Sequence, residues 1–332
     1  MARCDCPPIL EQAGESVLSR YFRGRFRREL NKMAKEFYIT GDQSGRRIDR
    51  LLRTLWPNVP LGAIMKALRK GEVRLDAKKA APDTRVEEGQ FLQVPWDDDT
   101  RELPDIDAYR ISIGEYKLET IYRDAYLWII NKQAGLLTQP DRKNGDSLIT
   151  RVLSELNWTR NDFRPSTVQR LDRNTSGAII VAMTGASLRH LSELIKNRKI
   201  RKIYRAVLSG EVLPSGEINL PLLKDPRENI VKVDEMGQEA LTKFRRISLG
   251  KDISAVEAEL VTGRPHQARA HFASLGNPIL GDKKYGGDAG KARRPLLHAY
   301  KLVFPDDAQL PEGLRGKEFI APLPKDMEEY FK

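Results

Sequence analysis

The sequence predicts an α+β protein: a small N-terminal α/β domain followed by a larger domain with a mixed, largely antiparallel sheet. Two patterns lead to this prediction. Between residues 38 and 97, two stretches with helical spacing of apolar residues precede short β runs. From about residue 116, many short β runs mix with helices without the regular β-α-β rhythm of a parallel sheet. A chain of 332 residues is long enough for both domains.

The spacing of apolar residues places the individual elements. In the first domain, helices are expected at 49–56 and 61–70, and Gly71 ends the second helix as a C-cap. Strands are expected at residues 73–75, 89–95, 127–131, 178–183, 202–208 and 254–261. In the second domain, an amphipathic pattern predicts a helix at 186–199, and a further helix is expected at 266–275.

Composition shifts give the domain boundaries. Residues 1–37 form a basic N-terminal extension, with seven basic residues against one acidic residue between Val17 and Lys35. This extension is either a basic helix that lies on RNA or a solvated tail. Residues 38–97 form the small domain, residues 98–115 form an acidic linker, and residues 116–332 form the larger domain.

The charge balance suggests a polyanionic partner. The chain has 57 Lys and Arg against 46 Asp and Glu, a net charge of +11. Cationic side chains that neutralise phosphates release counterions, so this excess favours a nucleic acid over a merely basic soluble protein. Only Cys4 and Cys6 are present, too few for a disulfide framework or a complete zinc site. With no apolar membrane span and no signal peptide, we expect a cytoplasmic protein with no membrane partner.

Motifs for metals and common cofactors are absent from the sequence. There is no phosphate-binding loop, no dinucleotide fingerprint, no nucleophile elbow and no His-Glu-x-x-His pair. The histidines are His190, His266, His271 and His298. His266 and His271 are five residues apart, so they lie on different faces of a helix and do not form a metal site. We therefore expect neither a metal nor a cofactor.

Three segments concentrate polar side chains near predicted strands. Arg170-Leu-Asp-Arg-Asn-Thr-Ser-Gly177 runs directly into an apolar strand. Its composition is also that of an ordinary turn, but Asp172 lies between two arginines that favour its ionised form as a nucleophile or base. Arg264 opens a helix in the second segment, where an arginine can pair with a carboxylate or steer an anion. Tyr204 lies on a strand within a basic run, where it either stacks on a base or packs in the core.

Taken together, these segments resemble the RluA-type pseudouridine synthases. The segment 170–177 resembles the family's central signature, and 202–207 its tyrosine strand. The segment 262–269, followed by 276–282 and 284–286, resembles its arginine motif and trailing loop. The stretches 131–137 and 294–302 resemble its opening and closing motifs, and all five occur in the family's order. The resemblance is strongest to the bacterial members that modify large-subunit ribosomal RNA.

The resemblance implies isomerisation of uridine to pseudouridine in RNA, with the fold of a pseudouridine synthase catalytic domain. Asp172 would be the catalytic carboxylate, either attacking the ribose or removing a proton from it. Arg264 would pair with Asp172, and Tyr204 would stack on the target base and assist the final proton removal. Arg170 and Leu297 would bind the substrate, with Arg170 filling the space that the flipped base vacates. No cofactor is needed, and the family suggests a monomer.

The first domain resembles the small RNA-binding domain named after ribosomal protein S four. Its match covers residues 45–52 and 64–74, and with the second domain the resemblance spans about residues 38–305. Basic side chains on its two helices and the following strand would hold RNA phosphates. They are Arg46, Arg47, Arg50, Arg53, Lys66, Arg69, Lys70 and Arg74.

Other functions remain open at this point. The nearest alternative within the same reaction is a synthase that modifies transfer RNA. A second class is a non-catalytic RNA-binding or ribosome-assembly factor, against which the presence of Asp172, Tyr204 and Arg264 argues. A hydrolase that uses Asp172 and a histidine is a third interpretation, weakened by the lack of a clear histidine partner.

Overall fold

The computed structural model divides the chain into two compact units, residues 1–102 and 103–332. It describes residues 35–56, 59–96, 117–141, 145–158, 163–225, 228, 230–288 and 292–332. The predicted linker 98–115 lies outside the described residues, as does the predicted extension 1–37 apart from its last three residues. Each unit is described here by itself.

The first unit packs two helices against a small antiparallel sheet. Its helices are α2 (Ile48–Leu55) and α3 (Leu61–Lys70), where both were expected. Gly71 ends α3 in the left-handed conformation with a φ of 72°, which confirms the predicted C-cap. The strands, in sheet order, are β1 (Lys35–Tyr38), β4 (Phe91–Val94), β2 (Arg74–Leu75) and β3 (Lys78–Lys79).

Strand β1 was not predicted. Residues 35–37, assigned to the extension from the sequence, pair with β4 at the sheet edge. The core of this unit comes from the apolar faces of α2 and α3, including Leu51, Leu52 and Ile64, none of which is exposed. The alternation of apolar and basic residues along both helices therefore leaves their charged faces to solvent.

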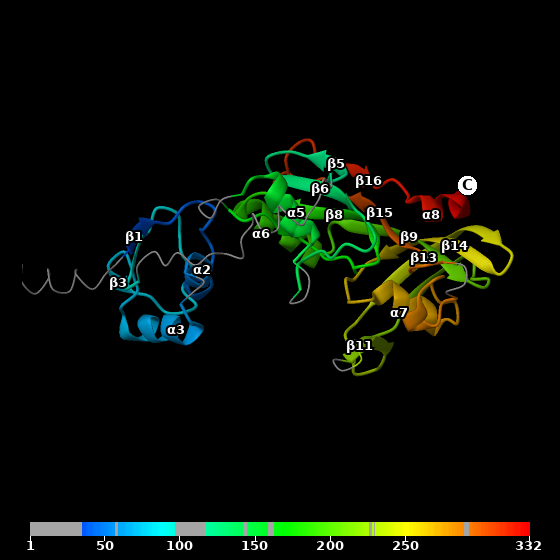
Figure 1. Ribbon diagram of the computed structural model, residues 1–332, viewed down its shortest axis with the longest axis horizontal. Coiled ribbons are helices and arrows are strands. Elements are labelled where there is room, and N and C mark those ends of the chain that lie inside the picture. The colour runs from blue at the N-terminus through cyan, green and yellow to red at the C-terminus, as the bar shows by residue number, and fades with distance from the viewer. Residues whose placement is uncertain are drawn as a thin grey trace, which may run out of the picture. The chain divides into compact units, whose positions relative to one another are not determined.

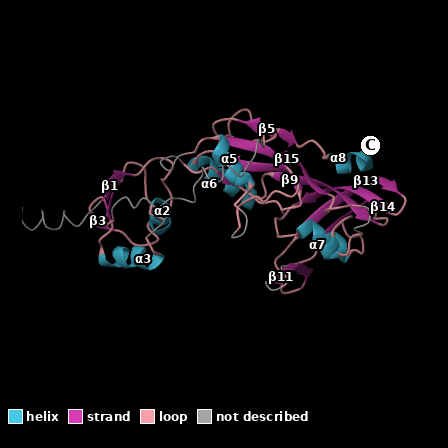
Figure 2. Ribbon diagram, viewed as in Figure 1, coloured by secondary structure: helices cyan, strands magenta, loops and turns pink. Residues whose placement is uncertain are grey.

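A mixed, largely antiparallel sheet forms the second unit, as the sequence predicts (Figure 2). In its described part the strand order is β10-β13-β14-β9-β15-β8-β6-β5, with β16 added beside β15 and β7 beside β8. Only β15 and β8 run parallel among these pairs. The strands are β5 (Thr120–Arg123), β6 (Leu127–Lys132), β7 (Ser166–Thr167), β8 (Ser176–Ala182), β9 (Arg201–Ser209), β10 (Ser215–Asn219), β13 (Leu241–Gly250), β14 (Ile253–Leu260), β15 (Leu297–Val303) and β16 (Glu318–Ile320).

Helices cover the two faces of this sheet. On one face, α5 (Leu148–Glu155) and α7 (Gln267–Ser274) pack against alternate residues of β6 and β8 and against β9 and β14. On the other face, α6 (Gly185–Lys196) packs with the segment around β16. Figure 1 shows α5 and α6 near β6 and β8, and α7 beside β9 and β13. Side chains alternate between the two faces along a strand, and packed elements cover both faces, so the side chains on both faces of β6 and β8 are buried.

Two further features position the functional residues. A separate hairpin, β11 (Leu222–Asp225) and β12 (Ile230–Val233), contacts α7. Gly177 at the start of β8 has a φ of 115°, and a Cβ there would overlap the carbonyl oxygen of Ala299. Glycine thus allows β8 and β15 to meet closely, which holds the loop before β8 beside the start of β15. The chain ends in α8 (Lys325–Glu328), and short 3-10 turns lie at Lys283–Tyr285 and Glu329–Phe331.

Candidate active site

The loop that leads into β8 places Asp172 at the end of the sheet where this strand begins. Backbone hydrogen bonds hold the loop on either side: Thr175 N–H donates to the Asp172 carbonyl, and Val168 N–H donates to the Ile180 carbonyl. The Asp172 side chain is 32% exposed, so it lies at a surface open to a ligand. The polar stretch before β8 is therefore a fixed turn that carries an accessible carboxylate.

Residues in and just after the opening motif fix the position of this loop. The Thr138 hydroxyl donates to the Leu171 carbonyl (2.8 Å) and accepts from the Leu171 N–H (3.2 Å). On the other side of Asp172, the Gly135 N–H donates to the Arg173 carbonyl (2.8 Å) and the Arg173 Nε donates back to the Gly135 carbonyl (3.0 Å). Both neighbours of Asp172 in the chain are thus tied to the segment after β6.

Lys132, the last residue of β6, adds a charged anchor. Its side chain is 1% exposed, and Nζ donates to the carbonyls of Gln133 (3.0 Å), Leu136 (2.8 Å) and Arg173 (3.2 Å). Burial lowers the pKa of Lys132 to about 7, while the negative charge of Asp172 opposes that shift. The three carbonyl acceptors match the three N–H bonds of the ammonium form. The opening motif therefore supports the Asp172 loop by hydrogen bonds.

A buried amide organises the loop before α7. Gln267 Oε1 accepts from the Thr262 hydroxyl (2.6 Å) and the Arg264 N–H (3.1 Å). Its Nε2 donates to the Leu241 carbonyl (2.9 Å) and the Thr242 hydroxyl (3.0 Å). Two of these hydrogen bonds stay within the loop and two join it to β13, so the first turn of α7 is held at a fixed place beside the Asp172 loop.

Arg269, not Arg264, pairs with Asp172, so the predicted pairing was wrong. Arg269 Nη1 donates to Asp172 Oδ2 (3.2 Å), and its Nε and Nη2 donate to Asp282 (2.6 and 2.8 Å). Arg264 precedes the helix, and its Nε donates to the Glu239 carbonyl instead (2.9 Å). The first turn of α7 faces Asp172 and carries Arg269, whereas Arg264 lies on the loop that leads into it.

The sequence carries a signal that favours Arg269 over Arg264 as the partner of a carboxylate. A cation in the first turn of a helix is disfavoured by the helix dipole, so a carboxylate partner stabilises an arginine three residues into α7. Asp282 is such a partner, with a side chain only 1% exposed, and Asp172 accepts a further hydrogen bond from Nη1. Asp282 was also not identified from the sequence as part of the site.

Tyr204 and Leu297 come from neighbouring strands of the sheet. Tyr204 lies on β9 and is 8% exposed, while Leu297 begins β15 opposite Ala206 and is 4% exposed. Burial raises the pKa of Tyr204 far above its usual value, and the charge of Asp172 adds to this shift. Its surroundings therefore strengthen the preference of the phenol for its protonated form.

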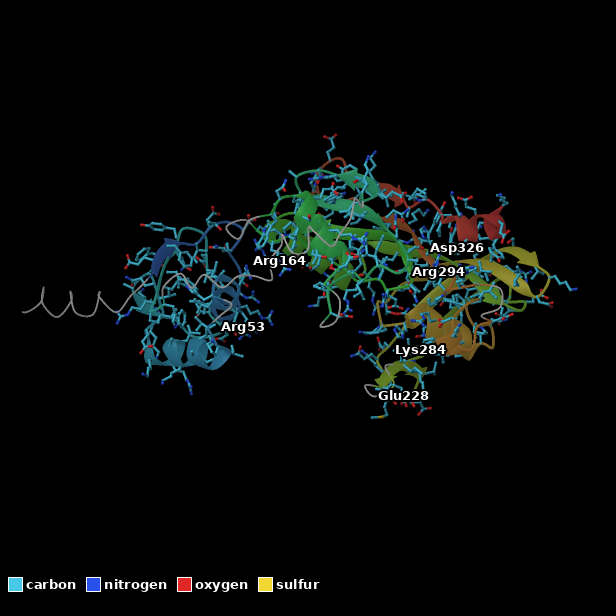
Figure 3. The ribbon with its side chains drawn as sticks, viewed as in Figure 1. Arg53, Arg164, Glu228, Lys284, Arg294 and Asp326 are labelled. Carbon is cyan, nitrogen blue, oxygen red and sulfur yellow. The ribbon has the colours of Figure 1, made fainter. Side chains whose placement is uncertain are left out.

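Arg294 links the loop to the end of the chain. Its Nε and Nη2 donate to Asp326 (2.7 and 2.8 Å), and Figure 3 labels both side chains. Its Nη1 donates to the carbonyls of Asn174 (3.2 Å), Pro295 (3.0 Å) and Leu297 (3.4 Å). One guanidinium therefore contacts both the Asp172 loop and the start of β15.

A cleft of about 710 Å³ brings these residues together. Of the residues predicted for the site, the cleft lining includes Arg170, Asp172, Tyr204, Arg264 and Leu297. Further lining residues supply basic and polar groups that the sequence analysis did not assign; they include Arg173, Lys202, Lys224, His266, Arg269 and Lys284. The volume and the concentration of basic groups suit a nucleotide that enters from an RNA strand.

A histidine also lies beside the carboxylate. His266 Nε2 is 3.9 Å from Asp172 Oδ2, so the hydrolase interpretation has a candidate partner in space. That distance is too long for a hydrogen bond. Within the described part of the chain, no group of three His, Cys, Asp or Glu is placed to hold a metal ion.

In the first unit, the basic residues predicted for RNA lie on α2, α3 and β2 and, for Arg46 and Arg47, just before α2. Arg46 and Arg47 are half-buried, and Arg47 forms an ion pair with Asp49 (2.9 Å). The other six are exposed; Lys70 has a long contact with Glu72 (3.6 Å). The exposed members are Arg50, Arg53, Lys66, Arg69, Lys70 and Arg74.

Comparison with protein families gives a match in the second unit. Residues 126–274 match the family described as RNA pseudouridylate synthase, a range that includes Asp172, Tyr204 and Arg269. Ribosomal large subunit pseudouridine synthase C of Vibrio cholerae is 31% identical over 315 residues, covering 91% of this chain and 97% of its own. The protein of the same name from Escherichia coli is 32% identical over 281 residues, covering 80% of this chain and 87% of its own.

Other relatives agree with this match. Ribosomal large subunit pseudouridine synthase D of Xylella fastidiosa is 30% identical over 317 residues, covering 90% of this chain and 92% of its own. The solved structure of human RNA pseudouridylate synthase domain containing 4 has a TM-score of 0.53 at 22% identity. The alignment covers 68% of this chain and 96% of the human one. This structural likeness shows a shared fold. Among the described helices, none is long and apolar enough to cross a membrane.

Proposed function

This chain belongs to the RNA pseudouridylate synthase family, and we propose that it converts specific uridines of bacterial large-subunit ribosomal RNA into pseudouridine. The observation that carries the proposal is the Asp172–Arg269 ion pair at a cleft lined by Tyr204 and Leu297. The names of relatives that align along nearly the whole chain support ribosomal RNA as the substrate.

The reaction is an isomerisation with no net loss or gain of atoms. The bond from C1′ of the ribose to N1 of uracil breaks, the uracil turns within the cleft, and a bond from C1′ to C5 forms. The proton on C5 is then removed, and N1 ends with a proton. Asp172 acts on the ribose either as a nucleophile at the sugar or as a base on a sugar proton, and no redox step is involved.

Each neighbouring residue has a role that its position supports. Arg269 stabilises the negative charge of Asp172 and orients the carboxylate through a charge-assisted hydrogen bond. Tyr204 stacks on the uracil, with Leu297 on the adjoining strand as a further apolar contact. Arg264 lines the same cleft, where its charge attracts the RNA backbone instead of pairing with Asp172.

The target nucleotide must leave its stack to reach the Asp172 carboxylate. Extruding a base costs a few kcal/mol. Arg170 is exposed beside the loop that carries Asp172 and lines the cleft. We propose that Arg170 occupies the space the base leaves and so reduces this cost.

Affinity for RNA comes in large part from the first unit, an RNA-binding domain resembling that of ribosomal protein S four. Six of its eight predicted RNA-binding residues are exposed, and phosphate contacts by such residues hold RNA without reading its sequence. Binding should weaken steeply with salt, because each neutralised phosphate releases counterions. We propose that the chain works as a monomer in the cytoplasm.

Pseudouridine mapping tests the proposal and separates it from its alternatives. Ribosomal and transfer RNA from cells that express the wild-type chain are compared with RNA from cells that express Asp172→Asn. Sites lost only from large-subunit ribosomal RNA support the proposal. Sites lost only from transfer RNA would show that transfer RNA is the substrate instead. If no site is lost, and the purified wild-type chain modifies no candidate transcript, the assembly-factor alternative is supported instead.

A further inference from the structure

A histidine and a tyrosine form a contact that leads to Asp172. His266 immediately precedes α7, and its Nδ1 is 2.8 Å from the hydroxyl oxygen of Tyr285. The two rings meet nearly at right angles, with their centroids 5.8 Å apart. The other ring nitrogen of His266, Nε2, lies 3.9 Å from Asp172 Oδ2. The imidazole therefore spans the space between Tyr285 and the proposed catalytic carboxylate.

The hydrogen bonds of Tyr285 determine which nitrogen carries the proton. The N–H of Val231, on β12, donates to the Tyr285 hydroxyl oxygen at 2.9 Å. A backbone N–H can only donate, so the hydroxyl accepts this bond and keeps its own proton for another acceptor. In the described part of the chain, its other hydrogen-bond partner is His266 Nδ1. Acceptance from an Nδ1–H would leave the hydroxyl proton without an acceptor among the described residues, whereas donation to Nδ1 uses it. Donation to Nδ1 is therefore favoured, and a neutral imidazole then carries its proton on Nε2.

The two tautomers of His266 would act on Asp172 in opposite ways. An Nε2–H directed at Oδ2 attracts the carboxylate and helps to orient it. An unprotonated Nε2 would turn a lone pair toward a negative charge and repel it. We propose that Tyr285 fixes the tautomer of His266 and that His266 is thereby a positioning residue for Asp172, an inference that rests on the proposed function.

The charges around His266 are consistent with a neutral ring. Burial lowers its pKa, Asp172 opposes this shift, Arg269 and Lys284 add to it, and Asp282 opposes it. The pKa of His266 is lowered overall. Donation from Tyr285 to Nδ1 acts in the same direction, because the nitrogen that accepts this bond is the one that would take up a second proton.

The contact also connects Asp172 to the hairpin β11–β12. Tyr285 packs against Leu222, Val231 and Ala270, so its position depends on the hairpin as well as on α7. Figure 3 labels Glu228 at the tip of this hairpin and Lys284, the neighbour of Tyr285, near α7. A displacement of the hairpin would remove the Val231 donor and release the constraint on the Tyr285 hydroxyl.

Substituting Tyr285→Phe removes the hydroxyl and keeps the ring. The chain offers a matched control, because the Tyr126 hydroxyl lies 2.7 Å from His190 Nδ1, and neither residue lines the cleft. Tyr126→Phe therefore removes the same type of contact away from Asp172. The first measurement is the 15N spectrum of the full chain labelled at histidine, which has four histidines. A His266→Gln spectrum identifies the signals of His266.

We expect wild-type His266 to show a protonated Nε2 and an unprotonated Nδ1. Tyr285→Phe should give a mixture of tautomers and a higher pKa, and Tyr126→Phe should leave the His266 signals unchanged. The inference is overturned if wild-type His266 carries its proton on Nδ1, or if Tyr285→Phe leaves the tautomer as it was. This readout requires no enzymatic activity, so it tests whether Tyr285 fixes the tautomer of His266 even if the proposed function fails.

The second measurement is the pH dependence of kcat for pseudouridine formation. Tyr285→Phe should lower kcat about three- to tenfold, because the imidazole acts at 3.9 Å without a direct hydrogen bond. The loss should be greatest where His266 is neutral and should shrink at low pH, where the protonated ring carries a proton on both nitrogens. KM should change little, and Tyr126→Phe should match the wild type. A purely structural role would lower kcat by the same factor at every pH. An active wild type with an unchanged Tyr285→Phe profile refutes this inference alone, whereas an inactive wild type refutes the proposed function.

Discussion

Replacing Arg269 with methionine should separate its structural role from its role at the carboxylate. Arg269 makes two hydrogen bonds to Asp282, whose side chain is 1% exposed, and one to Asp172. Arg269→Met leaves Asp282 as a buried charge without its partner, which costs about 3–5 kcal/mol of folding free energy. This is a large part of the stability of a typical domain, so urea unfolding will resolve it.

A second substitution then restores stability without restoring activity. Asp282→Asn removes the buried charge, and the double variant should regain roughly half of the lost free energy. Pseudouridine formation should remain low in the double variant, because Asp172 still lacks its cation. Unfolding in urea and single-turnover assays on the same RNA measure the two effects. If activity returns together with stability, Arg269 serves only the fold, and the reasoning is refuted.

Three other variants follow from the structure. Arg264→Met should raise KM for RNA while preserving more of kcat than Arg269→Met, as steady-state kinetics will show, because Arg264 does not contact Asp172. Burial lowers the pKa of His298 to about 4, so the unfolded state binds more protons as pH falls below 6.5. As pH falls from 6.5 to about 4, the wild type should lose about 3 kcal/mol of folding free energy that the His298→Gln variant does not lose. Urea unfolding at several pH values measures this difference. Asp326→Asn should cost under about 1 kcal/mol, since Asp326 is 47% exposed, but should lower kcat by loosening Arg294.

The sequence predicted most clearly the elements whose signal is local. The helices α2 and α3 have continuous apolar faces, and Gly71 stands where the chain must adopt a left-handed conformation. The strands β6 and β8 are nearly continuous apolar runs, which reflects their burial on both faces. In each case the residues themselves carry the pattern that the structure requires.

Elements that depend on distant partners were missed. Strand β1 exists because it pairs with β4, which lies more than 50 residues later in the chain. The hairpin β11–β12 exposes Leu223 and Val233, so its alternation gives no clean apolar face. Helix α5 was not expected, although Ser147 begins it with a capping box that closes on Thr150 instead of the usual Glu or Gln.

The site shows the same division. The segment around Asp172 was identifiable because its charged loop leads into a buried strand. The arginine that pairs with Asp172 was not identifiable in this way. Choosing between Arg264 and Arg269 requires the position of the first turn of α7, which the buried amide of Gln267 sets. Tyr285 lies in the loop that trails the arginine motif, and only its hydrogen bonds in the structure connect it to His266 and the site.

The most direct test of the account compares RNA binding and single-turnover pseudouridine formation by the wild type and Asp172→Asn. The exchange keeps the size of the side chain and removes its charge, so the loop held by Lys132 and Thr138 should persist. We predict that Asp172→Asn binds the mapped RNA with an affinity close to that of the wild type and forms no detectable pseudouridine. Formation at a rate comparable to the wild type would contradict the assignment of Asp172 as the catalytic carboxylate.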